Sequence, residues 1–219
     1  MPTPAEKLAD ARLYFVCDAR RPADEIRGVL EGAATGGADL IQLRDKDAGE
    51  DALRAAAAIF RDVADEHAIP FLINDRPDLV APLRADGVHV GQDDVPVAEA
   101  RRIAGAEAIV GLSSHAPEQL AAAEAATGDE RPDYLSVGPV WETPTKLGRP
   151  AAGLDYVRHA AANATLPWFA IGGIDPGNVA EVLAAGAERI VVVRAIADAA
   201  DPEGAARSLA ESVGAVGSR

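Results

Sequence analysis

Eight short apolar runs alternate with helix-like segments along this chain. The runs are rich in Val, Ile and Leu, as strands buried on both faces are. They span residues 13–17, 40–44, 71–74, 87–90, 108–113, 134–138, 168–172 and 189–193. Helical patterns occupy segments 51–68, 116–126 and 176–186 between them, the last two with a proline near the first turn. Strands that alternate with helices pair in parallel, so 219 residues in this order predict an α/β fold, a single (β/α)8 TIM barrel.

The chain is expected to form one domain. No linker or low-complexity segment interrupts residues 1–219, which divide into an N-terminal extension, 1–11, and a barrel at about 12–215. A weak repeat supports this, because "GGADLIQL", "LRADGVHV", "ERPDYLSV" and "AGAERIVV" each place an acid shortly before a strand. We interpret these acids as structural turn residues at the N-terminal end of the barrel.

Composition excludes some classes of function. The net charge of −14 disfavours a nucleic-acid partner, and no run approaches the ~20 apolar residues of a membrane span. The N-terminus has no signal-like segment, so we expect a cytoplasmic protein. Cys17 lies in an apolar run and is expected to be a packing thiol. Formation of a homo-oligomer is left open.

Polar residues follow the apolar runs, at the C-terminal strand ends where TIM barrels build their active sites. They include Asp18, residues 44–46, 74–76, 91–94 and 113–115, the 139–150 loop, Gly172–Gly173 and Arg194. Asp75 and Asp94 follow neighbouring strands and can share one Mg²⁺. Arg44, Lys46 and Lys146 can neutralise phosphate charge, and the Gly pair lets backbone N–H groups approach a phosphate. This rim suits phosphate chemistry with a divalent cation.

Each of these residues also has a purely structural interpretation. Asp75 can cap a short helix, Asp93 or Asp94 can cap the next one, and the Gly pair can be a plain turn. Thr143 and Thr145 fit an ordinary loop, and His89 fits a hydrogen-bonded core histidine. His115 fits a cap as well as a site. The coincidence of so many polar residues on one rim favours the functional interpretation.

At this point the chain resembles the thiamine phosphate synthase family. The resemblance rests on "IQLRDK", "FLINDRPDL", "ADGVHVGQDD", "GLSSH", "DYLSVGPVWETPTK" and "AIGGI", in order, from about residue 13 to about residue 198. It implies that the chain joins 4-amino-2-methyl-5-hydroxymethylpyrimidine diphosphate to 4-methyl-5-(2-phosphoethyl)thiazole. The products are thiamine phosphate and pyrophosphate, and the substitution is Mg²⁺-assisted and dissociative.

The resemblance also implies roles for residues. Asp75 and Asp94 would bind Mg²⁺, while Ser113, Lys146, Arg44 and Lys46 would be catalytic. The pyrimidine diphosphate would be held by Gln42, Leu43, Arg44, Asp45, Lys46, Asn74, Ser113 and Lys146. The thiazole phosphate would be held by Thr143, Pro144, Thr145, Gly173, Val193 and Arg194. Arg194 departs from the family, which usually has serine there, so its phosphate contact is a separate expectation. The partners implied are small-molecule substrates, without nucleic acid or membrane.

Three rival interpretations remain. A related barrel, the thiazole tautomerase, works without metal and does not need Asp75 or Asp94. A sugar-phosphate isomerase or aldolase is a second rival, but an aldolase needs a Schiff-base lysine within a strand, and none of the eight runs contains a lysine. A non-catalytic barrel that binds phosphate ligands is the third, and it predicts binding without turnover.

Overall fold

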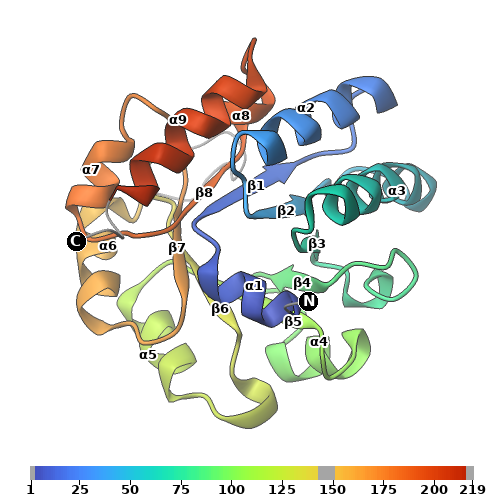
Figure 1. Cartoon of the computed structure of the whole chain (residues 1–219). Helices are drawn as coiled ribbons and strands as arrows, with labels where there is room; N and C mark the ends of the chain where they lie inside the picture. Colours follow the sequence, from blue (N-terminus) through green and yellow to red (C-terminus); the bar gives the residue numbers. More distant parts are fainter. Residues whose placement is uncertain (1–2, 143–150, 216–219) are drawn as a thin grey trace.

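The computed structural model describes residues 3–142 and 151–215, which form a closed barrel of eight parallel strands (Figure 1). Each strand pairs with its sequence neighbours, and β8 closes the ring against β1. The strands are β1 Leu13–Cys17, β2 Leu40–Leu43, β3 Phe71–Asn74, β4 Gly87–Val90, β5 Ile109–Ser114, β6 Tyr134–Val137, β7 Trp168–Ile171 and β8 Ile190–Val192. The predicted TIM barrel is therefore confirmed, and every predicted apolar run overlaps a strand.

The helices described lie around the ring, except that the first of them lies across one end of it. They are α1 Pro4–Asp10, α2 Ala23–Thr35, α3 Glu50–His67, α4 Val97–Ala104, α5 Pro117–Ala125, α6 Gly153–Asn163, α7 Val179–Ala184, α8 Arg194–Ala197 and α9 Pro202–Gly214, with 3-10 turns η1 Pro77–Leu79 and η2 Gly128–Glu130. The predicted helices at 51–68 and 116–126 are confirmed within a residue or so of their ends.

Two details of the predicted alternation are wrong. The β3–β4 connection carries the 3-10 turn η1 in place of an α-helix, because Pro82 lacks the N–H group that a helix continuing from Pro77 would need. The helix expected from Pro176 starts later, at Val179. Asp175 accepts a hydrogen bond from the Gly177 N–H at 2.7 Å, and this local side-chain bond holds residues 175–178 in a turn.

Side chains alternate between two apolar layers. Tyr14 and Val16 of β1 point into the barrel, whereas Leu13, Phe15 and Cys17 pack against the helices. This follows from the two-residue period of a strand, and a parallel sheet covered on both faces buries both sets. The interior cluster also contains Leu40, Leu72, Ile109, Tyr134, Phe169 and Val191. Cys17 is buried, which raises the pKa of its thiol to about 12 and agrees with a packing role.

Three of the four acids of the internal repeat are structural, as predicted. The carboxylate of Asp39 accepts hydrogen bonds from the Arg12 and Leu13 N–H groups at 2.8 and 3.0 Å. Asp86 does the same for Phe71 N–H at 2.8 Å, and Asp133 for Val110 N–H at 2.7 Å. Each acid therefore satisfies an amide at the start of the preceding strand. None of the helices described has both the length and the apolar character that crossing a membrane requires.

The N-terminal extension contains a helix that closes the bottom of the barrel. Helix α1 lies across the opening (Figure 1), with a capping box between Thr3 and Glu6. Its Leu8 is 3% exposed and belongs to the barrel's interior cluster. The guanidinium of Arg189, just before β8, donates to the Ala9 carbonyl at 2.7 Å. The helix therefore plugs the end of the barrel opposite the strand tips.

We expect Leu8→Ala to lower the free energy of unfolding by about 2–3 kcal/mol, because it opens a cavity where the plug meets the barrel interior. This is the low end of the usual range, since a terminal helix can shift to fill part of the space. Urea unfolding measures the change. Ile103→Ala, at a side chain 38% exposed, is the control and should cost less than about 0.5 kcal/mol. Equal effects from both substitutions would contradict a plugging role.

Candidate active site

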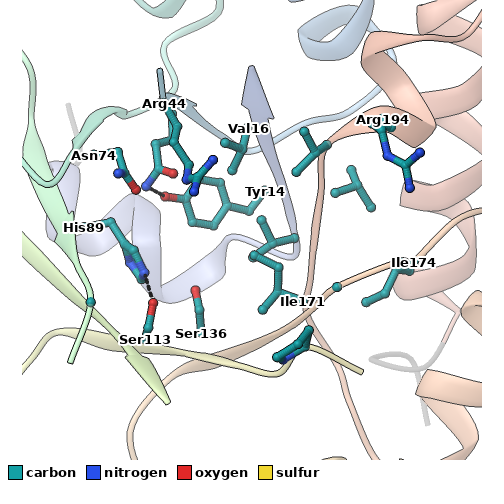
Figure 2. Close-up of a pocket in the computed structure, with 18 of the residues that line it drawn as sticks. Tyr14, Val16, Arg44, Asn74, His89, Ser113, Ser136, Ile171, Ile174 and Arg194 are labelled. Carbon is teal, nitrogen blue, oxygen red and sulfur yellow. Dashed lines mark hydrogen bonds between the residues drawn. The ribbon is translucent and has the colours of Figure 1, made fainter. Parts of the chain in front are cut away.

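A pocket of about 400 Å³ opens at the C-terminal ends of the strands. Ten of the predicted site residues line it: Gln42, Arg44, Lys46, Asn74, Asp75, Asp94, Ser113, Gly173, Val193 and Arg194. Figure 2 shows Asn74, His89 and Ser113 on one side, and Ile171, Ile174 and Arg194 on the other. The pocket therefore has a polar wall from β2–β5 and a more apolar wall from β7 and β8.

Asp75 turns its carboxylate toward this pocket through an unusual backbone conformation. Its φ of +59° is left-handed, a region that Asp tolerates better than most residues and that often marks functional sites. Its main-chain N–H still donates to the His89 carbonyl at 2.9 Å. The turn η1 has no side-chain cap, so Asp75 does not play the capping role that its sequence position also allowed.

Asp94 lies against Asp75. Its Oδ2 accepts from the Gly91 N–H at 2.8 Å, which closes the turn after β4, and helix α4 has no side-chain cap. The carboxyl groups of Asp75 and Asp94 are close enough to hydrogen-bond to each other. The helix-cap interpretation of Asp94 is therefore wrong, and the structure brings the two predicted metal ligands together.

Lys46 forms an ion pair with Asp75. Its Nζ lies 2.8 Å from Asp75 Oδ2. Burial raises the pKa of Asp75, the Lys46 ammonium opposes that shift, and the adjacent Asp94 carboxyl reinforces it. A carboxylate beside another carboxylate favours a proton or a cation, and among the residues that the structure describes Lys46 provides the positive charge next to Asp75.

The donor set fits Mg²⁺. This ion is commonly held by one or two carboxylates, with water and substrate phosphates in its other positions. Within the described residues there is no cluster of three or more His, Cys, Asp or Glu side chains, so a cage made entirely of protein ligands is not formed there. Two facing carboxylates on an open pocket match the Mg²⁺ pattern.

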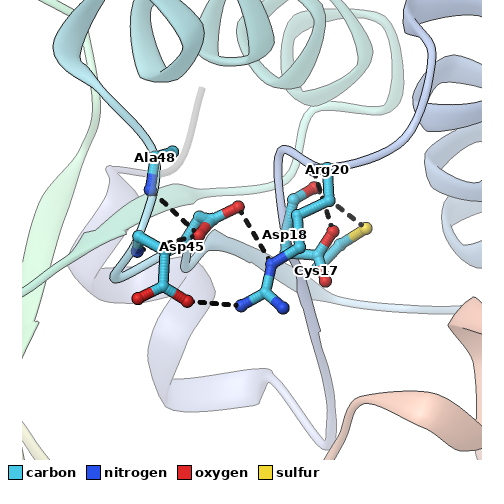
Figure 3. Close-up of polar contacts among 6 residues, drawn as sticks. Cys17, Asp18, Arg20, Asp45 and Ala48 are labelled. Carbon is cyan, nitrogen blue, oxygen red and sulfur yellow. Dashed lines mark hydrogen bonds and ion pairs between the residues drawn. The ribbon is translucent and has the colours of Figure 1, made fainter.

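Leu43 and Asp45 point away from the pocket. Leu43 is fully buried between the sheet and the helices, because it alternates with the inward-facing Gln42. The Asp45 side chain is 2% exposed; it accepts from the Ala48 N–H at 3.2 Å and lies 3.4 Å from the guanidinium of Arg20 (Figure 3). These side chains shape the β2 loop, so any contact they make with a ligand would come from their main-chain atoms.

The opposite wall is built around Gly173 and Arg194. Gly173 has φ +71°, and its carbonyl accepts from the Asn178 amide at 2.8 Å, which braces the loop after β7. Neither Arg44 nor Arg194 forms an ion pair with another residue in the described parts of the chain. Both guanidinium groups are therefore available to an anion. Thr143, Pro144, Thr145 and Lys146 lie outside the described residues.

Sequence reasoning missed several residues of the pocket. Tyr14, His89 and Ser136 line its floor, and the predicted core position of His89 is confirmed by its 8% exposure. Tyr134 reaches under them because residue 111 is glycine: a Cβ there would lie 2.2 Å from the Tyr134 ring. The available signal was strand alternation, which places Tyr14 and Gln42 on the inward face. His115, whose Nδ1 lies 2.5 Å from the Gly138 carbonyl, also lines the pocket.

Comparisons with known proteins agree on one family. The model of the family described as thiamine monophosphate synthase matches residues 13–196. The chain is 48% identical over 210 residues to a thiamine-phosphate synthase of Streptomyces avermitilis, covering 95% of this chain and 96% of that one. It is 54% identical over 204 residues to one from Thermus thermophilus, covering 91% and 96%. A solved thiamine phosphate pyrophosphorylase from Pyrococcus furiosus superposes with a TM-score of 0.81 at 31% identity, covering 97% of this chain and 98% of that one.

Proposed function

Because the chain belongs to the thiamine monophosphate synthase family and is a transferase of that family, we propose that the described pocket is where it makes thiamine phosphate. The substrates are the pyrimidine diphosphate and the thiazole phosphate named above. The bond between the pyrimidine methylene carbon and the diphosphate oxygen breaks, and that carbon joins the thiazole nitrogen. Pyrophosphate leaves with the electron pair of the broken bond, and no proton is transferred.

One observation carries the assignment of the diphosphate end. Asp75, Asp94 and Lys46 lie together in the polar wall of the pocket, with Lys46 Nζ 2.8 Å from Asp75. Magnesium held there would stabilise the negative charge that grows on the departing diphosphate. Lys46 and Arg44 would add fixed positive charge next to the same group. These interactions strengthen as the leaving group separates, which is the requirement for lowering the barrier.

The remaining walls suit the other partner and the reactive centre. Arg194 and the Gly173 backbone would bind the thiazole phosphate, and Asn74 and Gln42 would orient the pyrimidine. Val16, Ile171 and Val193 present apolar surface between the two ends. Water that reached the electron-poor pyrimidine methylene would react with it. An apolar lining keeps water away from this carbon and so favours its capture by the thiazole nitrogen. Lys146 and the 143–145 segment are proposed to complete both phosphate sites.

The rival tautomerase interpretation is tested by the same assay. Purified protein is mixed with both substrates and Mg²⁺, and thiamine phosphate and pyrophosphate are measured by chromatography. We expect both products in equal amounts, and we expect EDTA to abolish them until excess Mg²⁺ is added. Failure to form thiamine phosphate would overturn the proposal. Activity on a thiazole carboxylate that EDTA does not affect would favour the tautomerase instead.

Two further expectations from the sequence are proposals of their own. We propose the cytoplasm as the compartment, which fractionation of expressing cells tests. We also propose that residues 1–219 act as one domain. Limited proteolysis tests this, since a single domain should yield one resistant core that includes all eight strands.

A further inference from the structure

A chain of buried hydrogen bonds runs beneath the pocket from β2 to β5. Gln42 Nε2 donates to the Tyr14 hydroxyl at 2.6 Å, and the Tyr14 and Tyr134 hydroxyls lie 3.0 Å apart. The Tyr134 hydroxyl is 2.9 Å from His89 Nδ1, and His89 Nε2 is 3.0 Å from Ser113 Oγ. Figure 2 shows the last contact facing the pocket. Tyr14 and Tyr134 are 1% and 0% exposed, so water does not satisfy them.

The direction of each hydrogen bond in this chain follows from the Gln42 amide, which is the donor at its β2 end. An amide nitrogen only donates, so the Tyr14 oxygen accepts from Gln42. Tyr14 has one proton, and its other partner among the described residues is Tyr134, so Tyr14 donates to Tyr134. Burial raises the pKa of both phenols, which keeps them protonated. The Tyr134 proton then goes to His89 Nδ1.

This order leaves one state for the histidine. Nδ1 accepts from Tyr134, so the ring proton sits on Nε2 and is donated to Ser113 Oγ. In the reverse order, Ser113 would donate to His89, His89 to Tyr134 and Tyr134 to Tyr14. The Tyr14 proton would then have no acceptor among the described residues. A doubly protonated ring has the same defect, because Tyr134 would have to donate to Tyr14. An unmade hydrogen bond in a fully buried site is costly, so the order that starts at Gln42 is favoured.

From this geometry we propose that His89 is a positioning residue, which fixes Ser113 as a hydrogen-bond donor to the pyrimidine diphosphate. The proposal rests on the proposed function for the identity of that ligand. Ser113 Oγ accepts from His89, so its own proton is directed elsewhere, and Ser113 lines the pocket. The group it meets must be an acceptor, such as a phosphate oxygen or a ring nitrogen.

The same arrangement excludes a nucleophilic role for the Ser113–His89 pair. A serine nucleophile needs a base with a free lone pair to take its proton. In this order both nitrogens of His89 are committed, one as acceptor from Tyr134 and the other as donor to Ser113. That agrees with a substitution in which no proton is transferred.

The first test examines the wild-type protein without substrate. Nitrogen-15 NMR of the histidine side chains distinguishes an Nε2–H ring from an Nδ1–H or doubly protonated ring, and His89→Gln identifies the His89 signals by their loss. We expect the Nε2–H tautomer. An Nδ1–H or doubly protonated His89 would overturn the inference even if thiamine phosphate is made. Since this measurement needs no turnover, it stands if the proposed function fails.

The second test uses a matched pair of tyrosines. Tyr134→Phe breaks the chain of hydrogen bonds. Tyr156→Phe removes a hydroxyl that lies 2.5 Å from the Ser114 hydroxyl, and Ser114 follows Ser113 in β5 but does not line the pocket. We expect Tyr134→Phe to lower kcat/KM for the pyrimidine diphosphate about 10-fold. The KM for the thiazole phosphate should change less than about twofold. Tyr156→Phe should leave both constants near wild type. Equal effects of the two substitutions would overturn the inference.

A double-mutant cycle separates positioning from general damage. Ser113→Ala should lower kcat/KM for the pyrimidine diphosphate roughly 10- to 100-fold. Adding Tyr134→Phe to Ser113→Ala should then lower it little further, because the donor that Tyr134 orients is already absent. If the fold-losses in kcat/KM of the two single substitutions multiply in the double variant, Tyr134 acts independently of Ser113, and the proposed chain is overturned.

Discussion

Replacing Asp75 by asparagine should lower kcat for thiamine phosphate formation at least about 100-fold. The substitution removes one of two facing carboxylates and leaves the side chain nearly unchanged in size. Magnesium contributes several kcal/mol to such a leaving group, and each ~1.4 kcal/mol corresponds to a factor of ten in rate. Asparagine also tolerates the left-handed backbone of this position, so the fold should persist. Steady-state kinetics across a Mg²⁺ titration measures the loss, which excess Mg²⁺ should restore only in part.

Asp78→Asn is the matched control for this prediction. Asp78 lies in the following turn and pairs with Arg76 at 2.6 Å, away from the pocket lining. It should keep near-normal kcat. The double substitution of Asp75 and Asp94 should cost little more than Asp75→Asn alone, because one metal is shared. An active Asp75→Asn enzyme with unchanged Mg²⁺ dependence would contradict the metal assignment.

The pH dependence of Mg²⁺ binding follows from the same carboxylates. Burial and the adjacent Asp94 raise the pKa of Asp75, against the opposing effect of Lys46. A proton on Asp75 competes with the metal, so affinity for Mg²⁺ should be full well above this raised pKa and fall as the pH drops through it. The fall, measured by Mg²⁺ titration at a series of pH values, should begin at a higher pH than for an unperturbed aspartate.

Arg194→Ala should raise the KM for the thiazole phosphate roughly 10- to 100-fold and change the KM for the pyrimidine diphosphate far less. A guanidinium offers charge-assisted, bidentate hydrogen bonds to a phosphate, and bonds to charged groups are each worth about 1.5–3 kcal/mol. Arg194 lines the pocket on the β8 side, whereas the carboxylate pair lies at β3 and β4. Varying one substrate while the other is saturating separates the two effects.

Arg194→Ser tests how the residue acts. Serine keeps one hydroxyl donor at this position, so this variant should lose less than Arg194→Ala. Arg207→Ala, on the exposed side of α9 where Arg207 pairs with Glu203, is the control and should leave both KM values unchanged. Equal losses for both substrates would show that Arg194 shapes the whole pocket rather than binding one phosphate.

The closed barrel was predictable because its signals are local and repeated. Each strand is a short apolar run, and parallel strands present their C-terminal ends at one rim. Asp75 and Asp94 could therefore be paired from their positions alone, although either also fitted a helix cap. Neither η1 nor α4 has a side-chain cap, so the structure excludes the cap interpretation and instead places the two carboxyl groups in contact, which no local pattern reveals.

Local patterns failed where long-range packing sets the direction of a side chain. Leu43 and Asp45 belong to the motif around β2, yet one packs outward by strand alternation and the other bonds within its own loop and to Arg20. Helix α1 was expected only as an extension, because its short sequence does not reveal that Leu8 meets the barrel interior.

By itself the sequence determined the barrel and the polar residues that stand at its rim, since periodicity and strand order are properties of neighbouring residues. The tertiary structure alone decided what lies beneath the rim. Tyr14 and Tyr134 are 120 residues apart, and their hydroxyls meet because barrel closure makes the inward faces of β1 and β6 line one interior. The hydrogen-bond chain through His89 to Ser113 exists only once the eight strands have closed.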